Sequence, residues 1–212
     1  MNWYKGKTLL EELNSFELKQ EFSDLRLIIQ DLYQKNSEKI YFAILISGSL
    51  EKNETVYSYP KGEKVKIIKI FDGENEVEKI NAKKSIGIVV DKEIERGNVL
   101  VKQTKPLIKN EIVCPIFCII DKIEEGKEYV LKCFTQETKC KIEKIIEKID
   151  VETLEKTKDN KIDESEIGVV KIKFENPIVL EPFYKVKELG RFVILKNGKI
   201  VAGGIFDSNI RV

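Results

Sequence analysis

Apolar residues recur at helical spacing only near the start of this chain. Residues 8–18 place Leu9, Leu13 and Phe16 on one face of a predicted helix. Thr8 precedes this stripe and Glu11 follows three positions later, which is the spacing of a capping box. We therefore predict a short N-terminal helix with Thr8 as its N-cap.

Beyond the helix, short runs rich in β-branched residues alternate with turn residues, a pattern typical of β-strands. The first set of predicted strands covers residues 25–29, 40–46, 63–71 and 85–90. The second set covers residues 113–120, 127–134, 138–150, 168–174, 190–195 and 199–205. Alternation within 63–70 breaks at Ile67–Ile68, which indicates a bulge or a strand with a covered outer face. Residues 138–149 also have high helix propensity, but their neighbours favour a long bulged strand.

Turn residues separate these runs, among them Asp72-Gly73, Arg96-Gly97-Asn98 and Asn197-Gly198. Many short strands with almost no helical pattern favour closed antiparallel barrels over a parallel sheet. Pro106 cannot continue a central ladder, so residues 103–106 are interpreted as a linker. The predicted fold is all-β, with consecutive antiparallel β-barrels at residues 22–104 and 107–212 after an N-terminal segment of residues 1–21.

Composition excludes several classes of function. The 212 residues include 37 basic and 36 acidic side chains, and this balance disfavours a strongly basic nucleic-acid binder. The chain has no histidine, which removes Ser-His-Asp catalysis and histidine-ligated metals. Cys114, Cys118, Cys133 and Cys140 lack the two-residue gaps of zinc ligand pairs, so we interpret them as buried free thiols. With no signal peptide and no apolar stretch of about 20 residues, we expect a cytoplasmic protein and no membrane partner.

Several segments together resemble one protein family. They are Trp3-Tyr4-Lys5-Gly6 with Thr8-Leu9-Leu10-Glu11, then Tyr59-Pro60-Lys61-Gly62, Phe71-Asp72-Gly73, residues 93–100, residues 149–154, Asn176-Pro177-Ile178, residues 190–194 and residues 201–205. Through them the chain is similar, over essentially its whole length, to the GTPase subunit of sulfate adenylyltransferase, a relative of elongation factors. The Phe71-Asp72-Gly73 turn and residues 149–154 are more similar to the sulfate-activating branch than to elongation factors.

The resemblance implies domains of the translation-factor II and III types, with residues 1–21 matching the last helix of a preceding GTPase domain. In that family, GTP hydrolysis promotes adenylyl transfer from ATP to sulfate on a separate catalytic subunit. The implied partners are this adenylyltransferase subunit and a GTPase domain of the same or another chain. The sequence has neither a phosphate-binding loop nor a guanine-recognition motif. We therefore expect no cofactor in this chain, with GTP and magnesium confined to the GTPase domain.

Six residues are candidate contacts with another domain or a partner: Trp3, Tyr4, Ser49, Asp72, Arg96 and Arg191. The two N-terminal rings either fold back onto a barrel or belong to a docking surface. The three candidates of the first barrel are placed in loops, where turn geometry and surface ion pairing are the alternatives. Arg191 is either an internal ion-pair residue of the second barrel or a partner contact.

We predict a non-catalytic module that binds the adenylyltransferase subunit and couples it to the GTPase domain, the barrels acting as rigid bodies. One alternative is a pair of elongation-factor-like domains that bind aminoacyl-tRNA, which requires a contiguous lysine and arginine face. Another alternative is a stand-alone adaptor without a GTPase domain. Met1 stands where relatives often have an internal methionine, so a natural start and a boundary within a longer chain both explain it. We favour the second explanation.

Overall fold

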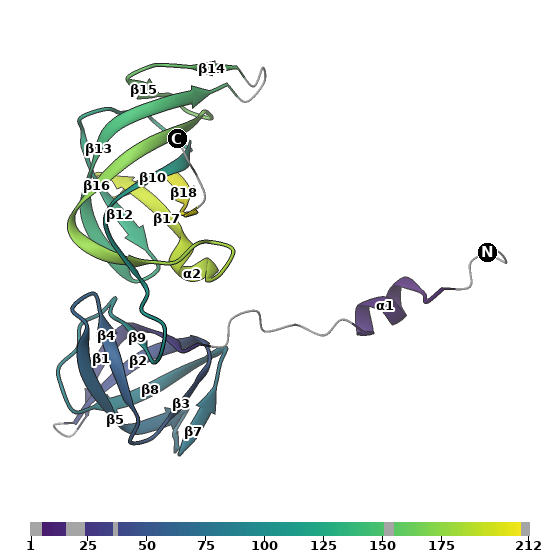
Figure 1. The fold of residues 1–212 in the computed structure, drawn as a ribbon, viewed down its shortest axis with the longest axis vertical. Helices are drawn as coiled ribbons and strands as arrows, with labels where there is room; N and C mark the ends of the chain where they lie inside the picture. Colours follow the sequence, from purple (N-terminus) through teal and green to yellow (C-terminus); the bar gives the residue numbers. More distant parts are fainter. Residues whose placement is uncertain (1–5, 16–23, 36–37, 151–154, 209–212) are drawn as a thin grey trace.

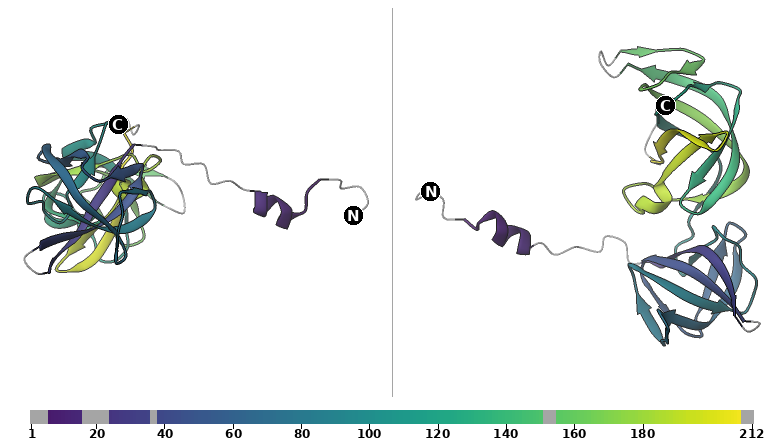
Figure 2. Two further views of the ribbon diagram at one scale, coloured as in Figure 1. Left: turned by 90° about the horizontal axis from the view of Figure 1, so that it is seen from below. Right: turned by 180° about the vertical axis from the view of Figure 1, so that it is seen from behind.

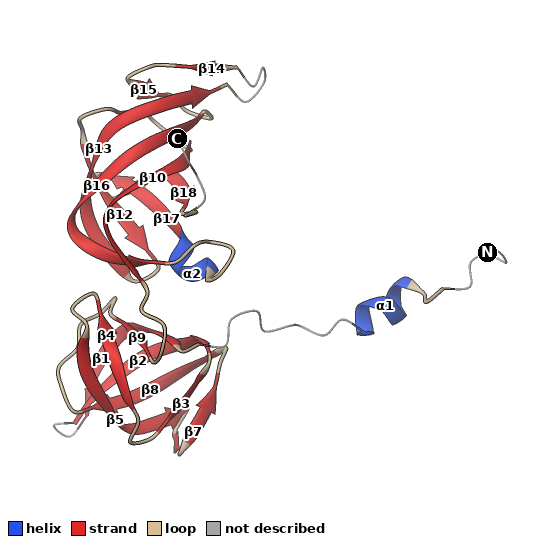
Figure 3. Cartoon of the chain, viewed as in Figure 1, coloured by secondary structure: helices blue, strands red, loops and turns tan. Residues whose placement is uncertain are grey.

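The computed structural model describes residues 6–15, 24–35, 38–150 and 155–208. These residues fold into two β-barrels and two short helices (Figures 1 and 3). The predicted all-β class with two consecutive antiparallel barrels is confirmed. Among the described residues, neither helix has the length and apolar character that crossing a membrane would require.

Barrel 1 is a closed ring of six antiparallel strands in the order β4-β9-β1-β2-β8-β5, with β4 pairing back onto β5. Alternate residues of β1 and β2 point inward, so Leu27 faces Leu45 and Ile29 faces Ala43 in a buried core. Two short strands, β3 and β7, pair beside the ring. The strands are β1 (Arg26–Lys35), β2 (Glu38–Ser47), β3 (Ser49–Glu51), β4 (Thr55–Tyr59), β5 (Glu63–Asp72), β6 (Asn75–Glu76), β7 (Lys79–Asn81), β8 (Lys84–Val90) and β9 (Val99–Val101).

Barrel 2 closes in the same way, in the order β12-β17-β18-β10-β16-β13, with β12 pairing onto β13. Helix α2 (Lys187–Gly190) connects β16 to β17 at the end that faces barrel 1 (Figure 1). The strands are β10 (Leu107–Cys118), β11 (Ile123–Glu124), β12 (Glu128–Cys133), β13 (Gln136–Ile149), β14 (Lys156–Thr157), β15 (Lys161–Ile162), β16 (Ile167–Leu180), β17 (Arg191–Lys196) and β18 (Lys199–Ile205).

Two irregular strands, β5 and β13, lie where the sequence pattern predicted them. β5 shifts register against β8 directly after Ile67, which confirms the bulge. β13 shifts register against β16 after Ile142 and again after Ile145, so this segment is a long bulged strand and not a helix. At the β17–β18 hairpin, Asn197 and Gly198 have φ of 52° and 77°, the left-handed pair that a type I′ turn requires.

Helix α1 (Leu9–Ser15) begins with the predicted capping box. The Thr8 N–H donates to Glu11 Oε2 at 2.7 Å, and the Glu11 N–H donates to Thr8 Oγ1 at 3.2 Å. None of the side chains of α1 is buried, and Figures 1 and 2 show the helix standing apart from both barrels. The remainder of the predicted helix, from Phe16 onward, lies outside the described residues.

Candidate functional site

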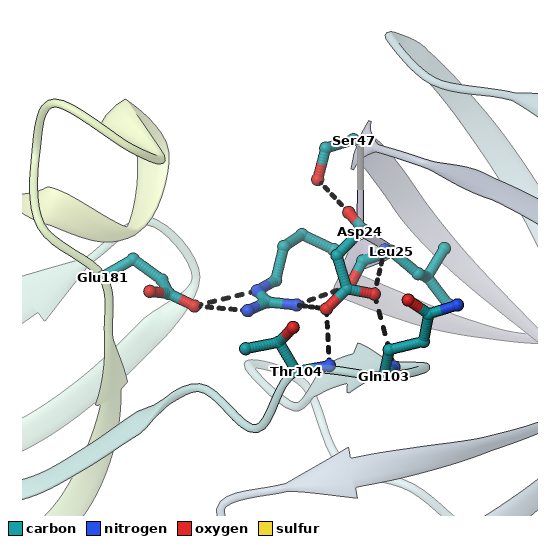
Figure 4. Close-up of polar contacts among 7 residues, drawn as sticks. Asp24, Leu25, Ser47, Gln103, Thr104 and Glu181 are labelled. Carbon is teal, nitrogen blue, oxygen red and sulfur yellow. Dashed lines mark hydrogen bonds and ion pairs between the residues drawn. The ribbon is translucent and has the colours of Figure 1, made fainter. Parts of the chain in front are cut away.

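A buried ion pair joins the two barrels. Arg26, in the apolar run at the start of β1, is only 1% exposed. Its Nε and Nη2 donate to Oε1 of Glu181, directly after β16, at 2.9 and 2.7 Å (Figure 4). Nη1 donates to the carbonyl oxygen of Leu25 at 2.9 Å and to Asp24 Oδ2 at 3.1 Å. An unpaired buried charge is costly, so these contacts hold the start of barrel 1 against the end of β16.

Asp24 attaches the interbarrel linker to the same point. Its carboxylate accepts hydrogen bonds from the backbone N–H of Thr104 at 2.6 Å and of Gln103 at 3.3 Å (Figure 4). Burial alone would raise the pKa of this carboxyl, but the Thr104 hydrogen bonds and the Arg26 guanidinium outweigh burial. The pKa of Asp24 is therefore lower than its ordinary value.

This shift predicts a specific acid sensitivity. Because the folded-state pKa of Asp24 lies below the unfolded value of about 3.9, its contribution to stability is complete above that pH. The contribution is lost as pH falls through the folded-state pKa. We expect the free energy of unfolding of an Asp24→Asn variant to depend less steeply on pH than that of the unaltered chain below about pH 4. Urea unfolding at a series of pH values measures the difference, and equal slopes would contradict it.

Apolar side chains from both barrels complete the contact. Ile28, Val99 and Val101 of barrel 1 cluster with Val179, Val186 and Leu189 of barrel 2, and all six are buried. A fully buried side chain of this size contributes about 1.5–3 kcal/mol relative to an exposed one. We call this cluster, together with Asp24, Arg26 and Glu181, the seam.

Two turns meet beside the seam. The Thr135 hydroxyl, from the β12–β13 turn, donates to the carbonyl oxygen of Ile29 at 2.9 Å. Gly97 has φ of 87°, and a Cβ there would lie 3.2 Å from the Cα of Gln136, so the two backbones touch where glycine is needed. Gln136 Nε2 in turn donates to the carbonyl oxygen of Val179 at 2.9 Å, and the Val179 N–H donates to Gln136 Oε1 at 2.8 Å. The polar groups of the seam are thus engaged with each other, which suits a structural joint and not a catalytic centre.

Barrel 2 also presents an apolar outer surface across β10, β17 and β18. Phe117 is 43% exposed and lies directly across from Gly203, which in turn faces Val193. Ile205 is exposed on the same side and faces Arg191 at the border. We define the apolar face by its outward residues, which are Pro115, Phe117, Ile119, Val193, Gly203 and Ile205. Contiguous exposed apolar surface of this kind is typical of an interaction site.

The predicted contact residues of barrel 1 lie on separate elements of the structure. Ser49 begins β3 and Asp72 ends β5, where it pairs with Lys84 at 2.6 Å, so both lie at strand ends and not in loops. Arg96 is exposed in the turn before Gly97, beside the seam. Within the described ranges, no hydrogen bond or ion pair links any two of these three predicted residues.

Arg191 lies at the border of the apolar face and is exposed. No ion pair of Arg191 is found in the described part of the chain, so the internal ion-pair alternative has no support there. Trp3 and Tyr4 lie outside the described residues.

Sequence reasoning missed Asp24, Arg26 and Glu181, although a lone arginine in the apolar run 25–29 was an available signal.

The four cysteines are free thiols inside barrel 2. Burial raises the pKa of Cys118 to about 11 and the pKa of Cys133 and Cys140 to about 12, and raises the pKa of Cys114 as well. Thiols with such pKa values are poor nucleophiles at neutral pH. No group of three or more cysteine, aspartate or glutamate side chains in the described ranges is placed to hold a metal ion.

Two consecutive six-stranded antiparallel barrels define the two-barrel portion of a translation-factor-type protein. A crystal structure of Sup35 complexed with GDP has this fold, with a TM-score of 0.82 and 21% identity over 99% of this chain and 54% of that chain. The chain belongs to the GTP-eEF1A C-terminal domain-like family, whose model matches residues 95–207.

Homologues named sulfate adenylyltransferase subunit 1 match nearly the whole chain. The protein of Alteromonas mediterranea is 27% identical over 97% of this chain, and that of Buchnera aphidicola is 29% identical over 98%. The resemblance stated from the sequence is therefore confirmed. The chain spans about half the length of these curated relatives, 46% in both cases.

Proposed function

We propose that this chain is the barrel portion of a sulfate adenylyltransferase GTPase subunit and acts as a non-catalytic coupling module. It binds the adenylyltransferase catalytic subunit and transmits to it the nucleotide state of a GTPase domain. GTP and magnesium are held by that GTPase domain and not by the barrels. The homology over nearly the whole chain supports the assignment to this subunit.

The seam is the observation that best supports the proposed coupling role. A relay must move as a unit, and the two barrels share a buried ion pair, a pinned linker and a six-residue apolar cluster. Relative motion would expose these apolar side chains and separate Arg26 from Glu181, and both changes are unfavourable. A displacement imposed on barrel 1 is therefore delivered to the surface of barrel 2.

The apolar face with Arg191 is the proposed contact for the catalytic subunit. Interface centres are enriched in aromatic residues and arginine, and this surface offers Phe117 beside exposed isoleucines with Arg191 at its border. The charged outer surface over β13 and β16 is a less suitable protein-binding centre, because lysines and glutamates alternate on it.

The same charged surface bears on the tRNA-binding alternative. Lys141 faces Lys173 and Lys144 faces Lys171 across neighbouring strands, which favours an anionic ligand because like charges repel. However, Glu111 and Glu143 each lie 3.1 Å from the Lys171 amino group and compensate it. This compensation of Lys171 weighs against a contiguous basic face of the kind that phosphate binding requires.

Calorimetry at physiological salt tests the proposal, with the adenylyltransferase catalytic subunit and tRNA as parallel titrants. We expect saturable binding to the subunit, at least about ten-fold weaker in Phe117→Lys because a charge would enter a buried apolar contact. Phe42→Lys is the matched control, because Phe42 is 47% exposed on the outer side of strand β2 in barrel 1. Salt-dependent binding of tRNA alone would favour the elongation-factor alternative, and tight binding of GTP would contradict the non-catalytic role.

A further inference from the structure

A groove lies on the outer surface of barrel 2, toward the end that is farther from barrel 1 (Figure 1). It is lined by residues of β13 and β16, by the turn before β12 and by the turn before β15. Its volume is about 610 Å³, which is within the range of pockets that hold small molecules. None of its lining residues belongs to the seam or to the apolar face, so this groove is a separate candidate site.

A β-bulge in β13 turns two consecutive side chains toward the groove. The pairing of β13 with β16 shifts register between Ile142 and Lys144. Glu143 and Lys144 therefore both lie beside Lys171 of β16. Ile142 and Ile145, which flank this pair, are buried in the core, whereas Lys144 is exposed. Regular alternation would turn one of the two residues inward, and bulges that re-aim a side chain in this way are frequent beside functional sites.

The lysines at the groove face one another and are only partly neutralised. Lys141 lies directly across from Lys173, and Lys144 lies directly across from Lys171. Like charges in direct opposition destabilise a sheet. The Glu143 carboxylate is shared, because its oxygens lie 3.1 Å from Lys171 Nζ and 3.8 Å from Lys173 Nζ. Lys141 and Lys144 make no ion pair with any described residue, so two ammonium groups are available to a ligand.

The two turns that line the groove are fixed to each other and to β13. The Glu125 N–H donates to the carbonyl oxygen of Asn160 at 2.9 Å. The Gly126 N–H donates to the carbonyl oxygen of Ile142 at 2.7 Å. Glu125 Oε2 accepts a hydrogen bond from the Ile145 N–H at 2.9 Å. The groove thus has a hydrogen-bonded frame, and the Asn160 side chain that lines it can supply an amide donor.

We propose that this groove binds a small tetrahedral oxyanion of the sulfate and phosphate class. Lys141 and Lys144 supply the charge, because lysine ammonium groups are compact donors on flexible stems that can converge on one ion. A bound anion also relieves the repulsion between the opposed lysines. A single ion needs no contiguous basic face, so the partial neutralisation of Lys171 does not prevent its binding. The inference is independent of the proposed function, because it involves neither the catalytic subunit nor the GTPase domain.

A titration of the full chain with sodium sulfate, and separately with sodium phosphate, tests the proposal by backbone amide chemical shifts. Sodium chloride keeps the ionic strength constant, because salt screens exposed charges. We expect saturable shifts of residues 125–126, 141–144 and 160. The ion with the lower half-saturating concentration is the preferred ligand, and saturable binding of either ion supports the proposal.

Three substitutions at the groove have expected effects of opposite sign. Lys141→Gln and Lys144→Gln should each raise the half-saturating concentration at least about five-fold, because each removes a charge-assisted hydrogen bond. Glu125→Gln should lower it about two-fold or more, because the carboxylate repels the anion. Lys139→Gln is the matched control and should change it less than about two-fold. Lys139 is exposed on the same strand and has no ion pair among the described residues, but it does not line the groove.

Three results would overturn the proposal. The first is shifts that do not saturate, or that chloride alone reproduces, which would mean general screening of surface charge. The second is a loss of binding in Lys139→Gln as large as that in Lys144→Gln, which would mean that the groove is not the site. The third is weaker binding in Glu125→Gln, since removal of a repelling charge cannot weaken an anion site here. Amide shifts of the barrel 2 core in the same spectra show that each variant is folded.

Discussion

Replacement of Arg26 by alanine is expected to lower the free energy of unfolding by about 3–5 kcal/mol. The guanidinium is the shared partner of Glu181 and Asp24, whose side chains are only 6% and 9% exposed. Its removal leaves two carboxylates facing each other in a largely dry seam, and an unpaired buried charge costs more than the ion pair contributes. Urea unfolding at neutral pH measures the loss, with Arg191→Ala as control because Arg191 is exposed.

A double replacement separates the charge from the packing. Arg26→Met with Glu181→Leu keeps apolar volume in the seam and removes the charges of both replaced residues. We expect this variant to be more stable than Arg26→Ala, because the Glu181 carboxylate is no longer left unpaired and Asp24 keeps its backbone hydrogen bonds from Gln103 and Thr104. If Arg26→Ala changes stability no more than Arg191→Ala does, the ion pair does not hold the barrels together.

The sequence was most informative where neighbouring residues decide the structure. Thr8 and Glu11 predicted the helix start, Ile67 predicted the bulge in β5, and Asn197-Gly198 predicted the β17–β18 turn. In each case the determining interaction lies within a few residues, so local stereochemistry is sufficient.

The joint between the barrels required the structure, because its residues are distant in the chain. Arg26 and Glu181 are separated by 155 positions, and nothing near either residue indicates the other. The apolar face also combines residues that are distant in the chain. Phe117, Gly203 and Val193 belong to three strands, and these strands become neighbours only when the barrel closes. The predicted contacts Ser49, Asp72 and Arg96 were chosen because each was expected in a turn. Residues in different turns need not lie close together in the folded barrel.

Replacement of Leu189 by alanine is expected to uncouple the barrels. Leu189 is fully buried in the seam cluster, and truncation of a buried leucine costs about 2–5 kcal/mol, part of it from the cavity left behind. Each barrel has its own hydrophobic core, and this substitution weakens only the contact between the barrels. We therefore expect urea unfolding to separate into two transitions or to show a reduced m-value. Leu131→Ala is the matched control, since Leu131 is equally buried but belongs to the interior of barrel 2.

The comparison of these two variants decides whether the seam can act as a relay. Leu131→Ala should lower the unfolding midpoint without changing m, because an intact seam still makes the barrels unfold together. Leu189→Ala should also broaden the distribution of interbarrel distances in small-angle scattering. Two separate transitions in the unaltered chain would mean that the barrels are independent bodies. Movement imposed on barrel 1 would then not reach the apolar face of barrel 2, and the seam would serve only the stability of each barrel.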